Sequence, residues 1–286
     1  MIIRAYAKIN PFLKITGTRP DGYHDLNLVF LPVTLCDTLS ATKNESGELR
    51  LSCTDLSIPI DDNNLITKAW QLVRSDFPDL PGMSIELEKQ IPSGAGMGGG
   101  SADAAAFLKL LEPVYGLSLS REQLFSYARR LGADVPALLL GQPSAGKGIG
   151  ELLTPLESRL KAELLIVSPG FFCSTKEMYS RFDGRKDLVQ PENGRRVERA
   201  MREGDLPGFC AGLFNVFEQL LDLEQRNSVE QIKKELLDAG ARGALMTGSG
   251  SCIFGVFETE AVRDQAAELF AGKYRVYSSE LLACNN

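Results

Sequence analysis

The alternation of apolar and polar residues predicts several strands in the first third of the chain. Met83, Ile85 and Leu87 are apolar and the residues between them are polar, a period of two that is typical of a half-buried strand. Further strands are predicted over residues 2–17, with a break at Pro11, over residues 26–39 and over residues 49–53.

Apolar spacing and capping residues predict the helices. Leu65, Ala69 and Leu72 recur at helical spacing, and Ser120 with Gln123 forms a capping box. The second half of the chain predicts helices over 175–182, 195–203, 205–222 and 228–239, strands over 164–167, 244–246 and 253–257, a loop over 141–150, and a last helix and strand. This mixture predicts an α+β fold of two lobes, which we divide into residues 1–155 and 156–286, with the site in a cleft between them.

A glycine-rich stretch separates the strand near residue 88 from an alanine-rich helix. It consists of Pro92, Ser93, Gly94, Ala95, Gly96, Met97, Gly98, Gly99, Gly100, Ser101 and Ala102. Glycine lets backbone N–H groups crowd around an anion, and the start of a helix adds further donors and the positive end of its dipole. We therefore predict a polyphosphate site here, with Ser101 as the N-cap of the helix.

Other glycine-rich loops fit this stretch less well. The spacing Gly94-x-Gly96-x-x-Gly99 matches the dinucleotide-binding fingerprint, but no strand ending in an acidic residue follows about 20 residues later. A Walker loop requires lysine where Gly100 stands, and the protein-kinase loop joins two strands. A loop that is glycine-rich only for tight packing is the remaining alternative.

Composition limits the class of protein. The formal net charge of −6 argues against nucleic acid or an anionic membrane as a partner. Six cysteines without a C-x-x-C spacing predict reduced thiols in a cytoplasmic protein. The sequence lacks a long apolar run, so we expect neither a signal peptide nor a membrane span.

Three motifs together resemble the GHMP kinase superfamily. They are the glycine-rich stretch, Ala7-Lys8-Ile9-Asn10 near the N-terminus, and Met246-Thr247-Gly248-Ser249-Gly250-Ser251-Cys252 near the C-terminus. The resemblance covers essentially the whole chain and implies the two-lobed GHMP kinase fold. Its N-terminal, ATP-binding lobe would be similar to domain 2 of ribosomal protein S5, and its C-terminal lobe would be ferredoxin-like.

Two further segments resemble one branch of the superfamily. Residues 16–24, ending in Asp21-Gly22-Tyr23-His24, and residues 132–136 are similar to kinases of the non-mevalonate isoprenoid pathway. Those enzymes transfer a phosphoryl group from ATP, with Mg²⁺, to the C2 hydroxyl of a cytidine diphosphate derivative of methylerythritol. A kinase for mevalonate, homoserine or a sugar and a non-catalytic ligand sensor are the rival interpretations.

The resemblance also implies residue roles for the transfer step. Asp134 would be the catalytic base, Lys8 would lie beside it and hold the γ-phosphate, and Asn10 would contact the substrate. Judged without the resemblance, Asp134 is an ordinary carboxylate after a helix end and Lys8 an ordinary lysine on a sheet face. Ser101 is the candidate magnesium ligand, because Ala102 replaces a second serine that many relatives carry.

For the nucleotide base, the resemblance implies an aromatic pocket. Tyr23 and Tyr179 would stack on the two faces of the cytosine, His24 would read its edge, and Thr175 would contact the substrate. His24 is the only histidine, which rules out a multi-histidine metal site; alone, it would be taken as structural.

Overall fold

The computed structural model describes residues 1–183, 185 and 187–282 and divides the chain into two compact units. Unit 1 comprises Met1–Ala7, Cys36–Ser93 and Gly98–Gly141, and unit 2 comprises Lys8–Leu35, Gly94–Met97 and the chain from Gln142 onward. Strands β1 (Ile2–Thr18) and β2 (His24–Asn44) contribute to both units. The predicted lobes at 1–155 and 156–286 stay a prediction; compactness assigns residues 8–35 and 94–97 to the same unit as the C-terminal half.

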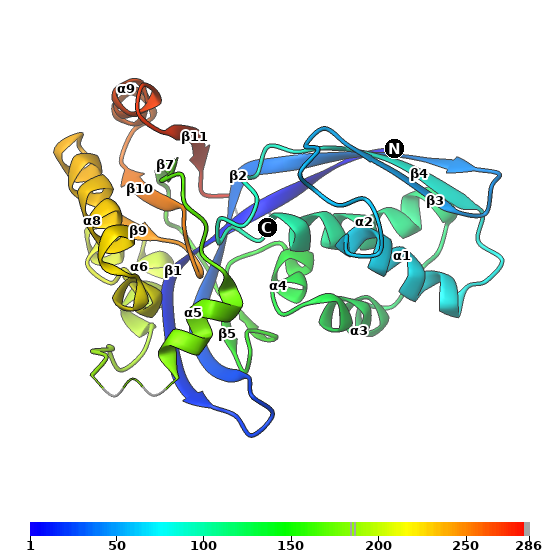
Figure 1. Cartoon of the computed structure of the whole chain (residues 1–286), viewed down its shortest axis with the longest axis horizontal. Coiled ribbons are helices and arrows are strands. Elements are labelled where there is room, and N and C mark those ends of the chain that lie inside the picture. Colours follow the sequence, from blue (N-terminus) through cyan, green and yellow to red (C-terminus); the bar gives the residue numbers. More distant parts are fainter. Residues whose placement is uncertain (184, 186, 283–286) are drawn as a thin grey trace. The chain divides into compact units, whose positions relative to one another are not determined.

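Unit 1 is a small sheet covered by helices. Its further elements are β3 (Leu49–Cys53), α1 (Leu65–Asp76), β4 (Gly82–Glu88), α2 (Gly99–Tyr115), α3 (Arg121–Leu131) and α4 (Val135–Leu140). Strand β4 pairs antiparallel with β2 and parallel with β3, and the parallel pair is joined through α1. All four helices lie on one side of β3 and β4 (Figure 1).

The core of unit 1 follows the predicted alternation. Met83, Ile85 and Leu87 are buried beneath the helices, while Glu86 and Glu88 are exposed. The alanine-rich start of α2 is also buried, because its small side chains permit close packing against α1 and α4. This packing holds the N-terminus of α2 in a fixed position at the end of the glycine-rich stretch.

Unit 2 contains a second sheet with the strand order β11-β7-β10-β9, in which neighbouring strands are antiparallel. Its elements are β5 (Ser144–Lys147), β6 (Leu152–Pro155), β7 (Glu163–Ser168), α5 (Thr175–Phe182), α6 (Arg195–Glu203), α7 (Leu206–Cys210), β8 (Phe214–Asn215), the 3₁₀ helix η1 (Val216–Leu220), α8 (Leu223–Asp238), β9 (Gly243–Met246), β10 (Ile253–Phe257), α9 (Glu260–Ala271) and β11 (Arg275–Glu280). Counted along the chain, the order is 4-1-3-2, which is that of the ferredoxin-like fold. The predicted C-terminal architecture is confirmed.

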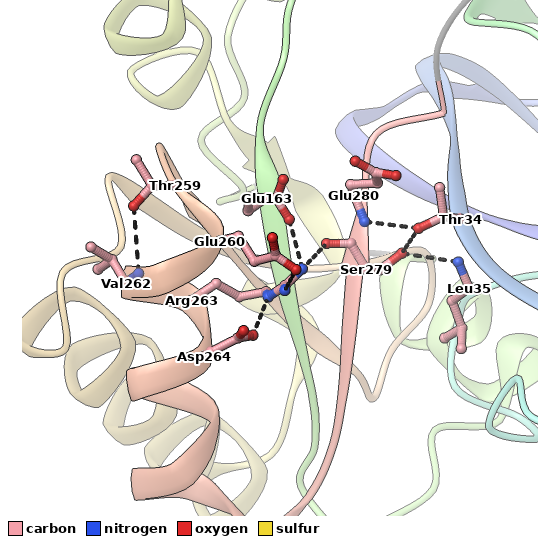
Figure 2. A network of polar contacts seen from close by, with 10 residues as sticks. All are labelled: Thr34, Leu35, Glu163, Thr259, Glu260, Val262, Arg263, Asp264, Ser279 and Glu280. Atoms are coloured by element: carbon pink, nitrogen blue, oxygen red, sulfur yellow. Dashed lines mark hydrogen bonds and ion pairs between the residues drawn. The ribbon is translucent and has the colours of Figure 1, made fainter.

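A polar network ties this sheet to α9 (Figure 2). The buried guanidinium of Arg263 in α9 forms ion pairs with Glu163 of β7 at 2.6 Å and with Glu260 and Asp264. The Ser279 hydroxyl of β11 in turn accepts a hydrogen bond from the backbone N–H of Leu35 at 3.0 Å. Side chains therefore join α9, two strands of the sheet and the middle of β2.

Several local predictions were wrong, among them those for Pro11, for the segment 205–222 and for the start of α8. Strand β1 continues through Pro11. The segment predicted as one helix over 205–222 folds as α7, β8 and η1, because residues Phe214–Asn215 pair with β1 and the Asn215 side chain accepts the N–H of Phe217. Helix α8 begins at Leu223 with a capping box of Asp222 and Gln225, one and a half turns before the predicted start.

The loop predicted over 141–150 contains β5, which pairs with β2. Cys36, Cys53, Cys173, Cys210 and Cys252 are free thiols, as predicted, and Cys284 lies outside the described residues.

Candidate active site

The glycine-rich stretch turns into helix at Gly98. Gly94, Gly96 and Gly98 have φ angles of 63°, 75° and 73°, a conformation that a side chain would strain. Gly98 itself is the N-cap of α2, so the prediction of Ser101 as N-cap is wrong; Ser101 lies in the first turn. An anion at this end of the 17-residue helix would meet its first backbone N–H groups and the positive end of its dipole.

A buried charged cluster lies beside the start of α2. The Lys89 ammonium donates to Asp103 Oδ2 at 2.8 Å and to Asp37 Oδ2. Asp37 Oδ1 also accepts the backbone N–H groups of Gln90 and Ile91 at 2.6 and 2.8 Å. Asp37 therefore fixes the chain just before the glycine-rich stretch.

Burial governs the ionisation of this cluster. The exposed fraction of the Asp103 side chain is 5%, and among the described residues its Oδ1 has no hydrogen-bond partner. Desolvation raises the pKa of Asp103 to about 7, against the opposing charge of Lys89. Burial alone would lower the pKa of Lys89, but the charges of Asp103 and Asp37 outweigh it and raise the pKa.

In unit 2, Lys8 belongs to a hydrogen-bonded network. Its ammonium donates to Asn10 Oδ1 and to the carbonyl of Gly96, both at 2.7 Å, and lies 5.9 Å from the centre of the Phe30 ring. The Asn10 amide donates to the carbonyl of Val29 at 3.0 Å, which fixes the amide so that its oxygen faces Lys8. Lys8 and Asn10, two residues apart in β1, are thus neighbours on one face of the strand.

The loop 247–251 lies against residues 94–97 of the glycine-rich stretch. A Cβ at Gly96 would lie 2.1 Å from the carbonyl oxygen of Thr247, and a Cβ at Gly248 would lie 2.6 Å from the carbonyl oxygen of Gly96. The buried Thr247 hydroxyl accepts the N–H of Asn10 at 3.0 Å. Glycine is required at both positions because the two backbones touch.

Asp134 lies in unit 1 at the N-cap position of α4, directly after α3 ends at Leu131, as predicted. Its φ and ψ of −82° and −21° are helical, and its side chain makes no capping hydrogen bond to α4. The Asp134 side chain therefore does not cap its own helix, which would be the simplest structural role for a carboxylate at this position.

An aromatic cluster surrounds His24 in unit 2. The imidazole stacks on Tyr179 at 4.9 Å between ring centres and meets Phe182 edge-on at 5.6 Å. Its Nε2 lies 2.8 Å from Asp183 Oδ1. Tyr179 also packs edge-on against Phe217, whereas Tyr23 is 59% exposed.

Comparison with known proteins places the chain in a family. Residues 64–142 match the family model described as GHMP kinases N terminal domain, and residues 197–275 match the one described as GHMP kinases C terminal. The chain is 36% identical over 283 residues to the 4-diphosphocytidyl-2-C-methyl-D-erythritol kinase of Clostridium tetani (strain Massachusetts / E88), covering 99% of this chain and 100% of the relative. The chain belongs to the GHMP kinase family.

Solved structures of GHMP kinases have the same fold. A crystal structure of 4-(cytidine 5'-diphospho)-2C-methyl-D-erythritol kinase matches with a TM-score of 0.85 and 32% identity, covering 99% of this chain and 100% of that one. A crystal structure of L. major mevalonate kinase in complex with R-mevalonate matches with a TM-score of 0.77 at 16% identity, covering 100% of this chain and 97% of that one. The second likeness concerns the fold alone.

The structure gathers some of the predicted site residues within one unit of this GHMP kinase. Lys8 and Asn10 meet residues 94–97, His24 meets Tyr179, and the Thr175 hydroxyl lies 2.8 Å from the hydroxyl of Ser249 in the loop 247–251. Asp134 and the start of α2 belong to unit 1.

Two contributors to the site were missed by the sequence analysis. Asp183 is 159 residues from His24 in the chain, and no spacing rule connects them. Asn215 donates to the carbonyls of Met246 and Gly248 at 2.6 and 2.8 Å and thereby holds the loop 247–251. No local pattern connects Asn215 with this loop, because Met246 lies 31 residues further along the chain.

The donor groups around α2 define what kind of metal they could hold. Among residues 1–183, 185 and 187–282, no three histidine, cysteine, aspartate or glutamate side chains come together as a metal site. Magnesium bound with a nucleotide uses one or two protein ligands together with phosphate oxygens and water. Ser101, in the first turn of α2, carries a hydroxyl that could serve as one such protein ligand.

Within the described part of the chain, no helix is both long and apolar enough to cross a membrane.

Proposed function

We propose that this GHMP kinase transfers the γ-phosphoryl group of ATP to the C2 hydroxyl of 4-diphosphocytidyl-2-C-methyl-D-erythritol, a step of isoprenoid precursor synthesis by the non-mevalonate pathway. The observation that carries the proposal is the aromatic cluster at His24, which pairs stacking rings with an imidazole. Such a cluster suits a nucleobase, and mevalonate and homoserine contain none. The full-length similarity to relatives of that name supports the same substrate.

The phosphate end would be held by backbone and charge. The first turn of α2 supplies N–H donors for the ATP phosphates, and the Lys8 ammonium supplies positive charge for the transferred group. The hydrogen bonds from Lys8 to Asn10 and Gly96 fix the position of that charge before the substrate binds. A preorganised charge stabilises the transition state without reorganising during the reaction.

Asp134 would receive the proton of the acceptor hydroxyl and orient that hydroxyl toward phosphorus. Its place between α3 and α4, within the segment 132–136 that resembles this branch of the family, supports the role. In a loose transition state the hydroxyl loses its proton late, so orientation is a large part of what Asp134 contributes.

Magnesium would reach the enzyme bound to the ATP phosphates, with Ser101 Oγ as the protein ligand that we propose. When bound, the ion neutralises negative charge on the β- and γ-phosphates.

At the other end, Tyr23 and Tyr179 would cover the two faces of the cytosine, and His24 would bind its edge. Asn10 and Thr175 would contact the part of the substrate between the base and the acceptor hydroxyl. We further propose a cytoplasmic enzyme without a nucleic-acid partner, which the free thiols and the net charge of −6 support.

The test is ADP release with ATP and a panel of alcohols: the cytidine diphosphate compound, mevalonate, homoserine and galactose. We expect turnover only with the cytidine compound. Turnover with another alcohol would assign the chain to a different GHMP kinase activity, and absence of ADP release with all of them would favour a ligand sensor.

A further inference from the structure

The end of α5 presents three side chains to His24. Tyr179 stacks on the imidazole face with an interplanar angle of 23°, Phe182 meets the imidazole at 86°, and Asp183 places its Oδ1 2.8 Å from Nε2. Residues three and four positions apart lie on the same face of a helix, which explains how one short helix supplies all three groups. The Asp183 N–H also bonds to the carbonyl of Tyr179 at 3.3 Å, so the carboxylate is anchored at the helix end.

We propose that Asp183 is a positioning residue that fixes the tautomer of His24 and thereby makes the enzyme select cytosine over uracil. An ionised carboxylate can only accept hydrogen bonds. The Nε2 atom facing it must therefore carry the proton, and the Nδ1 atom of the neutral ring is left as an acceptor.

The two pyrimidines differ at the atom that an acceptor would detect. Cytosine carries an amino group at C4, which donates hydrogen bonds, and uracil carries a carbonyl oxygen there, which only accepts them. An Nδ1 acceptor can receive a hydrogen bond from the amino group of cytosine, whereas it forms none with the carbonyl oxygen of uracil and is repelled by it. The opposite tautomer would reverse this preference, so the proton position on His24 sets the choice of base.

Burial makes this choice effective. The exposed fraction of the His24 side chain is 5%, so a mismatched base would leave polar atoms unpaired where water cannot readily replace the lost hydrogen bond. The Thr18 hydroxyl donates to the same Asp183 oxygen at 3.5 Å and helps to keep the carboxylate in place. This inference rests on the proposed function, because it assumes that the base binds at His24.

A direct test uses the unaltered protein. His24 is the only histidine of the chain, so protein labelled with ¹⁵N-histidine and produced without an affinity tag gives NMR signals from one imidazole alone, one for Nδ1 and one for Nε2. We expect the proton on Nε2, both before and after addition of CDP. A proton on Nδ1 in either state would overturn the proposal.

A second test uses variants, with calorimetric affinities for CDP and UDP as the readout. In Asp183→Asn, the amide can donate to Nε2 as well as accept from it, so we expect the CDP-to-UDP affinity ratio to fall about tenfold, the effect of one ordinary hydrogen bond. The matched control is Asp187→Asn, because Asp187 is an exposed acid nearby that pairs with Arg185. It should keep the ratio of the unaltered protein.

The remaining outcomes separate the inference from the proposed function. If Asp183→Asn weakens CDP and UDP equally and the ratio stays constant, Asp183 has only a structural role and the inference is wrong. If the unaltered protein prefers CDP and Asp183→Asn does so to the same degree, the inference alone fails. If the unaltered protein binds neither nucleotide, the proposed base pocket fails together with it.

Discussion

Lys89 in unit 1 and His24 in unit 2 are buried to the same degree, but their carboxylate partners differ in exposure. Each side chain is 5% exposed. Asp37 and Asp103, which pair with Lys89, are 0% and 5% exposed, whereas Asp183 beside His24 is 52% exposed. The first cluster is thus a fully desolvated set of charges, and the second is a ring held between other rings with one partner at the surface.

This difference separates stability from recognition. Removing one member of a buried ion pair leaves an uncompensated charge in the interior, which is costly to the fold. A stacked ring with a solvent-exposed partner can be altered at smaller cost to the fold, so changes there should be felt mainly in ligand affinity. Substitutions at Lys89 and Tyr179 test this contrast, and two further predictions concern Asp134 and the glycine-rich stretch. All four are ordered from the largest expected effect to the smallest.

Lys89→Met should lower the free energy of unfolding by about 3–5 kcal/mol, because two buried carboxylates lose their shared cation. Urea unfolding monitored by circular dichroism measures it. Lys234→Met is the control, since Lys234 is 75% exposed and pairs with Asp238 on the surface of α8. Equal losses in both variants would show that burial does not distinguish the two lysines.

Asp134→Asn should reduce kcat about 100-fold or more while ATP binding and the midpoint of unfolding stay unchanged, because the amide cannot take up a proton. Steady-state kinetics with the cytidine substrate measures kcat, and calorimetry measures ATP affinity. Asp79→Asn, which alters an exposed acid of the same unit, serves as control. Turnover close to that of the unaltered enzyme would remove Asp134 from the mechanism.

Tyr23→Ala and Tyr179→Ala should each raise KM for the cytidine substrate about 5- to 150-fold, from the stacking energy of one base. KM for ATP should stay constant in both. Tyr179 supports His24 and Phe217 whereas Tyr23 is exposed, so only Tyr179→Ala should also lower the unfolding midpoint. If Tyr179→Ala leaves substrate KM unaltered and Tyr23→Ala raises it, another side chain covers the second face of the base.

Two alanine substitutions within the glycine-rich stretch should change the free energy of unfolding in opposite directions. Gly98→Ala forces a side chain into a φ of 73° and should destabilise by about 1–2 kcal/mol. Gly100→Ala lies in the first turn of α2 with no atom nearer to the new Cβ than 3.9 Å, so helix propensity should stabilise it by up to about 1 kcal/mol. Thermal unfolding of the pair measures both effects. Destabilisation of the same size in both would mean that backbone conformation is not the cause.

The sequence by itself determined the elements whose signals are local. The alternation at Met83, Ile85 and Leu87 identified β4, and the capping box at Ser120 and Gln123 identified the start of α3, since both depend on residues a few positions apart. The glycine-rich stretch before an alanine-rich run indicated the start of α2 for the same reason. The motifs were also sufficient to indicate the family and its activity.

Only the tertiary structure decided which distant residues meet. Nothing in the neighbourhood of Lys89 in the chain reveals that Asp37 would be buried with it, and Asp183 reaches His24 across 159 residues. The segment after Asp205 was wrongly predicted as one helix, because two of its residues form backbone pairs with β1 instead of continuing the helix. Long-range hydrogen bonds and the burial of charge depend on how the chain folds back on itself, and no periodicity along the sequence records that.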